Sequence, residues 1–223
     1  MSSDSQLSFP FAETSTQERL QRAIEPIKSL YRDQAYNLQE KRNLSTCTEG
    51  CAHCCEQLFS ISVIEAIYAL SYYSQKLGGS LEGLSRATAW HVAIGKMHNW
   101  DSKKWFTLEM PCVFLKENSC SIYPARPWAC RAYYVKSDPK LCEAGGDVNI
   151  LIGGREKTHY MNAILDSIKE LSLPYGRIPM ALALQWGMIF MLNGMKSLNK
   201  DVKRVTGEEV KEGEAFYYRG ERK

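Results

Sequence analysis

The sequence lacks a long apolar run. Its most apolar stretch covers residues 179–192 and contains Gln185 and Gly187, whereas a helix needs about 20 apolar residues to cross a bilayer. The first ten residues are polar and do not combine a basic segment with an apolar one, so no secretory signal is predicted. These absences predict a buried helix near 179–195 and a cytoplasmic protein without a membrane span.

Charge of one sign is also missing. The chain has 28 Lys and Arg residues against 25 Asp and Glu residues, which leaves a net charge of +3 over 223 residues. This balance does not favour a nucleic acid or an anionic membrane as partner. A protein substrate or partner is a candidate, and the sequence does not define the oligomeric state.

Cysteine, by contrast, is abundant. Thiols stay reduced inside cells, so many cysteines in a chain without an export signal point to metal or redox chemistry rather than to disulfides. All lie in segments rich in turn or capping residues, where the backbone can bend around an ion, and none lies within an apolar helical pattern. We therefore predict that all eight bind a metal or cofactor: Cys47, Cys51, Cys54, Cys55, Cys112, Cys120, Cys130 and Cys142.

The first four cysteines cannot all bind one zinc ion from a straight helix. In such a helix Cys47 and Cys54 would be about 10 Å apart along the axis at a rise of 1.5 Å per residue. The sulfurs around one zinc ion all lie about 2.3 Å from the metal. Either residues 47–55 form a loop around a larger cluster or these cysteines belong to different sites, and at least one later cysteine completes the coordination. Eight thiols allow two four-thiolate sites, one iron–sulfur cluster with spare thiols, or one binuclear site.

The hydrophobic pattern is mainly helical. A first helix is predicted from the Ser15–Glu18 capping box to an interruption at Pro26, where a second helix begins and runs to about 38. Further helices are predicted from 62 to about 78, from 81 to 97, from 161 to 171 and near 179–195. Residues 112–123 predict two short strands around a polar turn. The predicted fold class is therefore mainly α, a compact helical domain with a small irregular β-hairpin that carries cysteines and wraps around a metal or iron–sulfur centre.

Four segments of a single folded unit are predicted. These are N-terminal helices (1–46), a metal-binding core with the cysteines (47–142), C-terminal helices that pack on the core (143–195) and a polar tail (196–223).

The cysteine segments resemble the CxxxCxxCC cysteine-cluster proteins, a family described as a zinc- or iron-chelating domain. The similarity is carried by CTEGCAHCC (47–55), the helix containing Glu65, PCVFLKENSCSIYPARPWACR (111–131) and Cys142. It implies a bound metal or iron–sulfur centre over residues 47–142.

The cluster region is also similar to that of the flagellin lysine N-methylases, which implies a [4Fe-4S] centre and a methyltransferase-like or oxidoreductase activity. Zinc is the alternative, in a structural or regulatory module that recruits a protein partner. The CxxxCxxC spacing of Cys47, Cys51 and Cys54 equals that of radical S-adenosylmethionine enzymes, but the alternating strands and helices of those enzymes are not predicted. S-adenosylmethionine is therefore the weakest cofactor candidate.

Three further residues are expected beside the centre. Arg126 and Arg131 flank Cys130 and can stabilise thiolate charge, bind a substrate carboxylate or form salt bridges within the turn. Tyr123 is expected to donate a hydrogen bond near sulfur. No catalytic residue is predicted, and a thiol oxidoreductase using Cys54 and Cys55 is disfavoured because nothing nearby resembles a thioredoxin unit.

Overall fold

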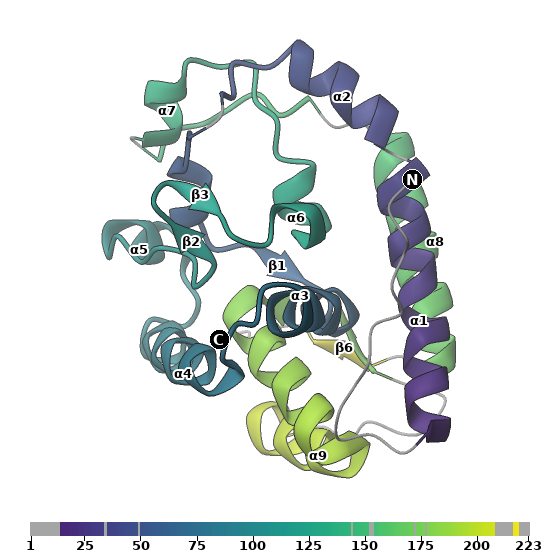
Figure 1. Cartoon of the computed structure of the whole chain (residues 1–223). Helices are drawn as coiled ribbons and strands as arrows, with labels where there is room; N and C mark the ends of the chain where they lie inside the picture. The colour runs from purple at the N-terminus through teal and green to yellow at the C-terminus, as the bar shows by residue number, and fades with distance from the viewer. Residues whose placement is uncertain are drawn as a thin grey trace.

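The computed structural model describes residues 14–33, 35–48, 50–143, 145–151, 154–171, 173–176, 178–207 and 216–218. Residues 1–13 and two parts of the predicted polar tail, 208–215 and 219–223, lie outside these ranges. Within them the fold is mainly α, as predicted (Figure 1). The helices are α1 (Thr14–Asp33), α2 (Ala35–Asn43), α3 (Val63–Lys76), α4 (Leu81–Met97), α5 (Ser102–Thr107), α6 (Trp128–Arg131), α7 (Pro139–Glu143), α8 (Gly154–Leu171) and α9 (Met180–Thr206), with short 3-10 helices η1 (His53–Glu56) and η2 (Tyr123–Ala125).

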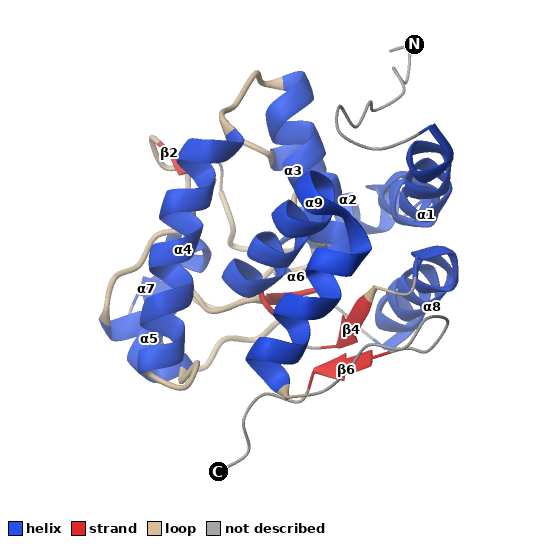
Figure 2. Cartoon of the chain, turned by 90° about the horizontal axis from the view of Figure 1, so that it is seen from below, coloured by secondary structure: helices blue, strands red, loops and turns tan. Residues whose placement is uncertain are grey.

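The strands are short and pair in twos. β1 (Ser60–Ile61) pairs antiparallel with β5 (Ile178–Pro179), and β2 (Leu115–Lys116) pairs antiparallel with β3 (Ser119–Cys120). β4 (Pro174–Gly176) and β6 (Phe216–Tyr218) pair in parallel and are seen together in Figure 2. The β2–β3 hairpin confirms the predicted cysteine-bearing hairpin, because Cys120 lies in β3.

Helix α9 is the centre of the core. It packs against α3 and α4, while α1 and α8 run side by side along one edge of the molecule (Figure 1). Trp186 of α9 and Ile67 and Leu70 of α3 are all fully buried. A Cβ atom at Gly187 would lie 3.0 Å from Leu70 Cδ1, so this glycine allows the close approach of α9 to α3.

Helix α1 passes through Pro26, so the predicted interruption there is wrong. Proline removes one helical hydrogen bond and normally bends or ends a helix. Here Ala23, Ile24 and Ile27 are fully buried on both sides of the proline, and α1 packs along α8. The burial of this apolar face offsets the lost hydrogen bond.

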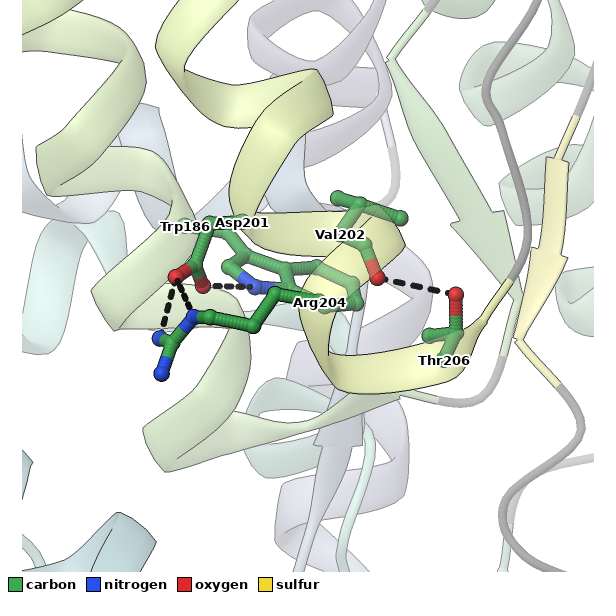
Figure 3. A network of polar contacts seen from close by, with 5 residues as sticks. All are labelled: Trp186, Asp201, Val202, Arg204 and Thr206. Carbon is green, nitrogen blue, oxygen red and sulfur yellow. Dashed lines mark hydrogen bonds and ion pairs between the residues drawn. The ribbon is translucent and has the colours of Figure 1, made fainter.

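The apolar helix ends close to residue 195, as predicted, because the helical path breaks at Gly194, and a second helical segment continues α9 to Thr206. Gly194 has φ 75° and ψ −178°, a conformation that breaks the helical path. Beyond Gly194, Asp201 accepts a hydrogen bond from Trp186 Nε1 at 3.1 Å and forms an ion pair with Arg204 (Figure 3). In a straight helix residues 186 and 201 would be about 22 Å apart, so the second half of α9 folds back onto the first.

No helix among the described residues is long and apolar enough to span a membrane. The buried-helix prediction for 179–192 is confirmed, because most of its side chains belong to the core. The division into four segments stays a prediction.

Candidate metal centre

One cavity of about 540 Å³ is lined by all eight cysteines. They come from the loop before η1, from η1 itself, from the segment of the β2–β3 hairpin, from α6 and from α7. None of them forms a disulfide. Cysteines that begin at residue 47 and end at residue 142 therefore face the same space.

The first cysteine segment is a loop followed by a short 3-10 helix. Gly50 has φ 83°, a left-handed conformation that favours glycine, and Cys51 N donates to Thr48 O at 3.2 Å. Cys55 N then donates to Ala52 O at 2.7 Å at the start of η1. The alternative of a single straight helix over residues 47–55 is thus excluded.

The β2–β3 hairpin is attached to η1 through the backbone. Cys112 N donates to Cys55 O at 2.8 Å, and Leu115 is paired with Cys120. Glu117 and Asn118 form the turn with φ of 49° and 58°, and positive φ at both central residues is typical of a type I′ hairpin. The hairpin thereby places Cys112 and Cys120 against the residues of η1.

Helix α6, which carries Cys130, is attached to the core through Glu65. This carboxylate is 1% exposed. Its Oε1 accepts hydrogen bonds from Trp128 N at 2.7 Å and Tyr31 Oη at 3.0 Å. Its Oε2 accepts from Ser62 N at 3.0 Å, Ser62 Oγ at 2.9 Å and Tyr160 Oη at 2.8 Å. Glu65 therefore joins α1, α3, α6 and α8 at one buried point.

The role of Glu65 beyond its capping box was missed from the sequence. The Ser62–Glu65 pair is a visible local pattern, and the structure confirms it as a capping box. The partners from α1, α6 and α8 are 34, 63 and 95 residues away along the chain. No local pattern identifies contacts at such separations.

Arg126 is a buried cation on the cavity wall. It is 8% exposed, donates from Nη2 to Tyr134 Oη at 3.1 Å and lies 3.5 Å from the centroid of the Tyr123 ring. Its Nε has no hydrogen-bond partner, and no carboxylate among the described residues forms an ion pair with it. Burial raises the pKa of Cys120, and a hydrogen bond with Cys55 and burial raise the pKa of Cys54; the Arg126 charge offsets part of both increases. Arg126 and Tyr123 thus both line the cavity that the cysteines line.

Arg131 lies elsewhere. It does not line the cavity; its guanidinium covers the Tyr31 ring at 4.2 Å from the centroid, and Nη2 donates to Pro124 O at 2.6 Å. Arg131 therefore holds the chain between η2 and α6 against α1 rather than facing the thiols.

Burial favours the protonated form of several cavity thiols. It raises the pKa of Cys112 to about 12 and the pKa of Cys130 well above its ordinary value. The pKa of Cys54 is also raised, first by a hydrogen bond with Cys55 and then by burial. Since a metal binds the thiolate, binding at these residues releases protons.

The donor set fits zinc or an iron–sulfur centre. Both are bound by four thiolates, and sulfur is a soft ligand that both accept. Among the described residues, no three His, Cys, Asp or Glu side chains are arranged to hold a single ion. The thiols surround a space rather than one point.

Comparison with known proteins agrees with this donor set. Residues 46–145 match the CxxCxxCC family, whose description is "Putative zinc- or iron-chelating domain". No curated protein and no solved structure is significantly similar to the chain. The match contains all eight cysteines and supports metal binding by this part of the chain. The chain is thus similar to the CxxCxxCC family over residues 46–145, slightly less than half of its length.

Proposed function

We propose that this domain binds an iron–sulfur centre through the thiolates of its cysteines. The observation that carries the proposal is that eight free thiols line one cavity of about 540 Å³. Zinc in a four-thiolate site needs sulfurs about 2.3 Å from a single point. An iron–sulfur cluster has its own iron and sulfide atoms between the thiolates, so it suits donors that surround a wider space.

The buried charge of Arg126 supports an anionic centre. A guanidinium that is 8% exposed and has no carboxylate partner among the described residues is costly to bury. Metal centres with four thiolate ligands carry a net negative charge, which would compensate the positive charge of this guanidinium. Arg126, held against Tyr123 and Tyr134, thus offers the centre a fixed counter-charge.

When bound, an iron–sulfur cluster supplies one-electron redox chemistry. The chain contributes the thiolates, holds Cys112 and Cys130 in partly buried positions, and stabilises negative charge through Arg126. We therefore place electron transfer first among the activities. Methyl transfer, which the resemblance to flagellin lysine N-methylases implies, is the second candidate activity of the same centre.

The test is the metal and sulfide content of protein purified without oxygen. We expect iron and acid-labile sulfide in comparable amounts, with broad visible absorbance, because both atoms belong to the cluster. Cys130→Ser should lower both contents. Ala129→Ser, which changes the neighbouring residue of α6 outside the cavity lining, should leave them unchanged.

Two results would contradict the proposal. Protein that contains zinc without sulfide, and that does not take up iron and sulfide on reconstitution, would point to a zinc-binding module instead. Protein that takes up neither metal would remove metal binding altogether.

A further inference from the structure

Two cations line the thiol cavity, and no carboxylate does so in the described part of the chain. Arg42, at the end of α2, is half-buried, and Arg126, which follows η2, is buried. No ion pair joins either guanidinium to an Asp or Glu of the described residues. Taking a charge out of water without a partner is costly. The cavity therefore favours negatively charged contents, and Arg42 remains uncompensated when the proposed centre compensates Arg126.

Both arginines act on Tyr123. The guanidinium of Arg126 lies 3.5 Å from the centroid of the Tyr123 ring. Burial raises the pKa of Tyr123, but a hydrogen bond and the charge of Arg126, together with the charge of Arg42, lower it overall. Tyr123 lines the cavity and is 47% exposed, so it lies where the cavity meets solvent. The two cations are therefore found at the same end of the cavity, at its opening.

This end of the cavity has hydrogen-bond donors without acceptors. A guanidinium carries five N–H donors. Nη2 of Arg126 donates to Tyr134 Oη, whereas its buried Nε has no partner. Asn118, in the exposed turn of the β2–β3 hairpin, adds a side-chain amide to the lining. A ligand with anionic oxygen atoms would supply the acceptors that these donors lack.

The remaining wall of the cavity is largely apolar. It includes the side chains of Phe59, Phe114, Ile122 and Met180. Binding sites for small molecules typically have a volume of about 300–1,000 Å³, mostly apolar walls and a few polar groups that fix the ligand's orientation. The cavity of about 540 Å³ has all three features. A small organic molecule can therefore lie in it beside a metal centre.

We propose that the cavity binds a small organic monocarboxylate beside the thiolate centre, with the carboxylate at Arg42 and Arg126 and the apolar part of the molecule along the aromatic and aliphatic wall. A guanidinium binds a carboxylate through two parallel hydrogen bonds. A single negative charge is favoured over the two of a phosphate monoester, because the proposed centre is itself anionic and like charges repel. This inference rests on the proposed function and names the class of ligand that the same cavity takes.

The test titrates metal-loaded protein, purified without oxygen, with para-fluorobenzoate and follows the fluorine NMR signal. The neutral control is para-fluorobenzamide, which has nearly the same shape. We expect saturable binding of the carboxylate, at least about tenfold tighter than that of the amide, because hydrogen bonds between charged groups are the stronger ones. The dianion para-fluorophenyl phosphate should bind more weakly than para-fluorobenzoate.

Two variants locate the carboxylate. Arg42→Gln should weaken para-fluorobenzoate binding about tenfold, the effect of losing one hydrogen bond to a charged group, and should leave amide binding and metal content unchanged. Lys41→Gln is the matched control. It removes the same charge from the neighbouring residue of α2, which does not line the cavity, and should leave the affinity for both probes unchanged.

Several results would overturn the inference. These are equal affinity for carboxylate and amide, undiminished carboxylate binding in Arg42→Gln, tighter binding of the phosphate, and loss of metal together with carboxylate binding in Arg42→Gln. The comparison of carboxylate with amide uses the unmodified chain, so it does not depend on the folding of a variant. Protein that holds iron and sulfide but binds no carboxylate contradicts this inference alone. Protein that holds zinc without sulfide and binds the carboxylate contradicts only the proposed iron–sulfur centre.

Discussion

Glu65 shows how a single buried residue positions part of the site. A buried carboxylate is costly unless its oxygens are fully hydrogen-bonded, and here five hydrogen bonds reach it. Two of the donors are backbone N–H groups, from Ser62 and Trp128, and they reach different oxygens. A backbone N–H group can only donate, so each of the two carboxylate oxygens must accept a hydrogen bond.

Replacing Glu65 by Gln should therefore destabilise the fold by about 1–3 kcal/mol, the cost of leaving a buried polar group unsatisfied. Whichever carboxylate oxygen is replaced by the amide NH₂ group, that group faces one of the two backbone N–H donors and cannot accept its hydrogen bond. Urea unfolding of reduced, metal-free protein measures the change.

Tyr160→Phe is the matched control, because it removes one hydroxyl donor and leaves both backbone donors satisfied. It should cost less, about 1 kcal/mol. A Glu65→Gln variant as stable as the wild-type protein would contradict the assignment of Glu65 as the point that holds α6.

At the scale of elements, α9 depends on a single glycine. Its two halves meet at Gly194, and the hydrogen bond from Trp186 to Asp201 joins the first half to the second (Figure 3). The φ and ψ of Gly194 fall in a region that is essentially restricted to glycine. A Cβ atom there would contact nothing within 4 Å, so the requirement comes from the backbone alone.

Gly194→Ala should accordingly destabilise the protein by about 1–3 kcal/mol, the cost of that backbone conformation for other residues. Gly83→Ala, in the first turn of α4, should instead stabilise by about 0.4–1 kcal/mol, because a Cβ atom there would meet only Ser80 Cβ and Oγ at an ordinary contact distance of 3.9 Å. Thermal unfolding of the two variants should show shifts of opposite sign. Stabilisation by Gly194→Ala would mean that α9 does not fold back at this point.

Elements with local signals could be predicted from the sequence, and elements shaped by distant contacts could not. The bounds of α4, the capping box of α3 and the turn of the β2–β3 hairpin follow from residues within a few positions of each other. The passage of α1 through Pro26 depends on burial against α8. Helix α5 was missed because a six-residue helix within an aromatic, charged segment has too short a pattern to detect.

At the scale of the whole molecule, a helical core supports a cavity built from irregular segments. α3 and α9 supply buried apolar surface, and the cysteine segments attach to this core through Glu65 and the β1–β5 pair. The cysteine pattern predicted the identity of the cavity thiols, since metal-binding chemistry depends on residue type. It could not separate Arg126, which faces the thiols, from Arg131, which faces Tyr31, because their positions depend on how η2 and α6 pack.

The central claim is that the cavity thiols bind an inorganic centre. X-ray absorption at the metal edge of loaded protein tests it most directly, since the spectrum reports which atoms surround the metal. We expect a first shell of sulfur alone, at about 2.3 Å for thiolate ligands. A first shell dominated by nitrogen or oxygen would place the metal outside this cavity and contradict the account.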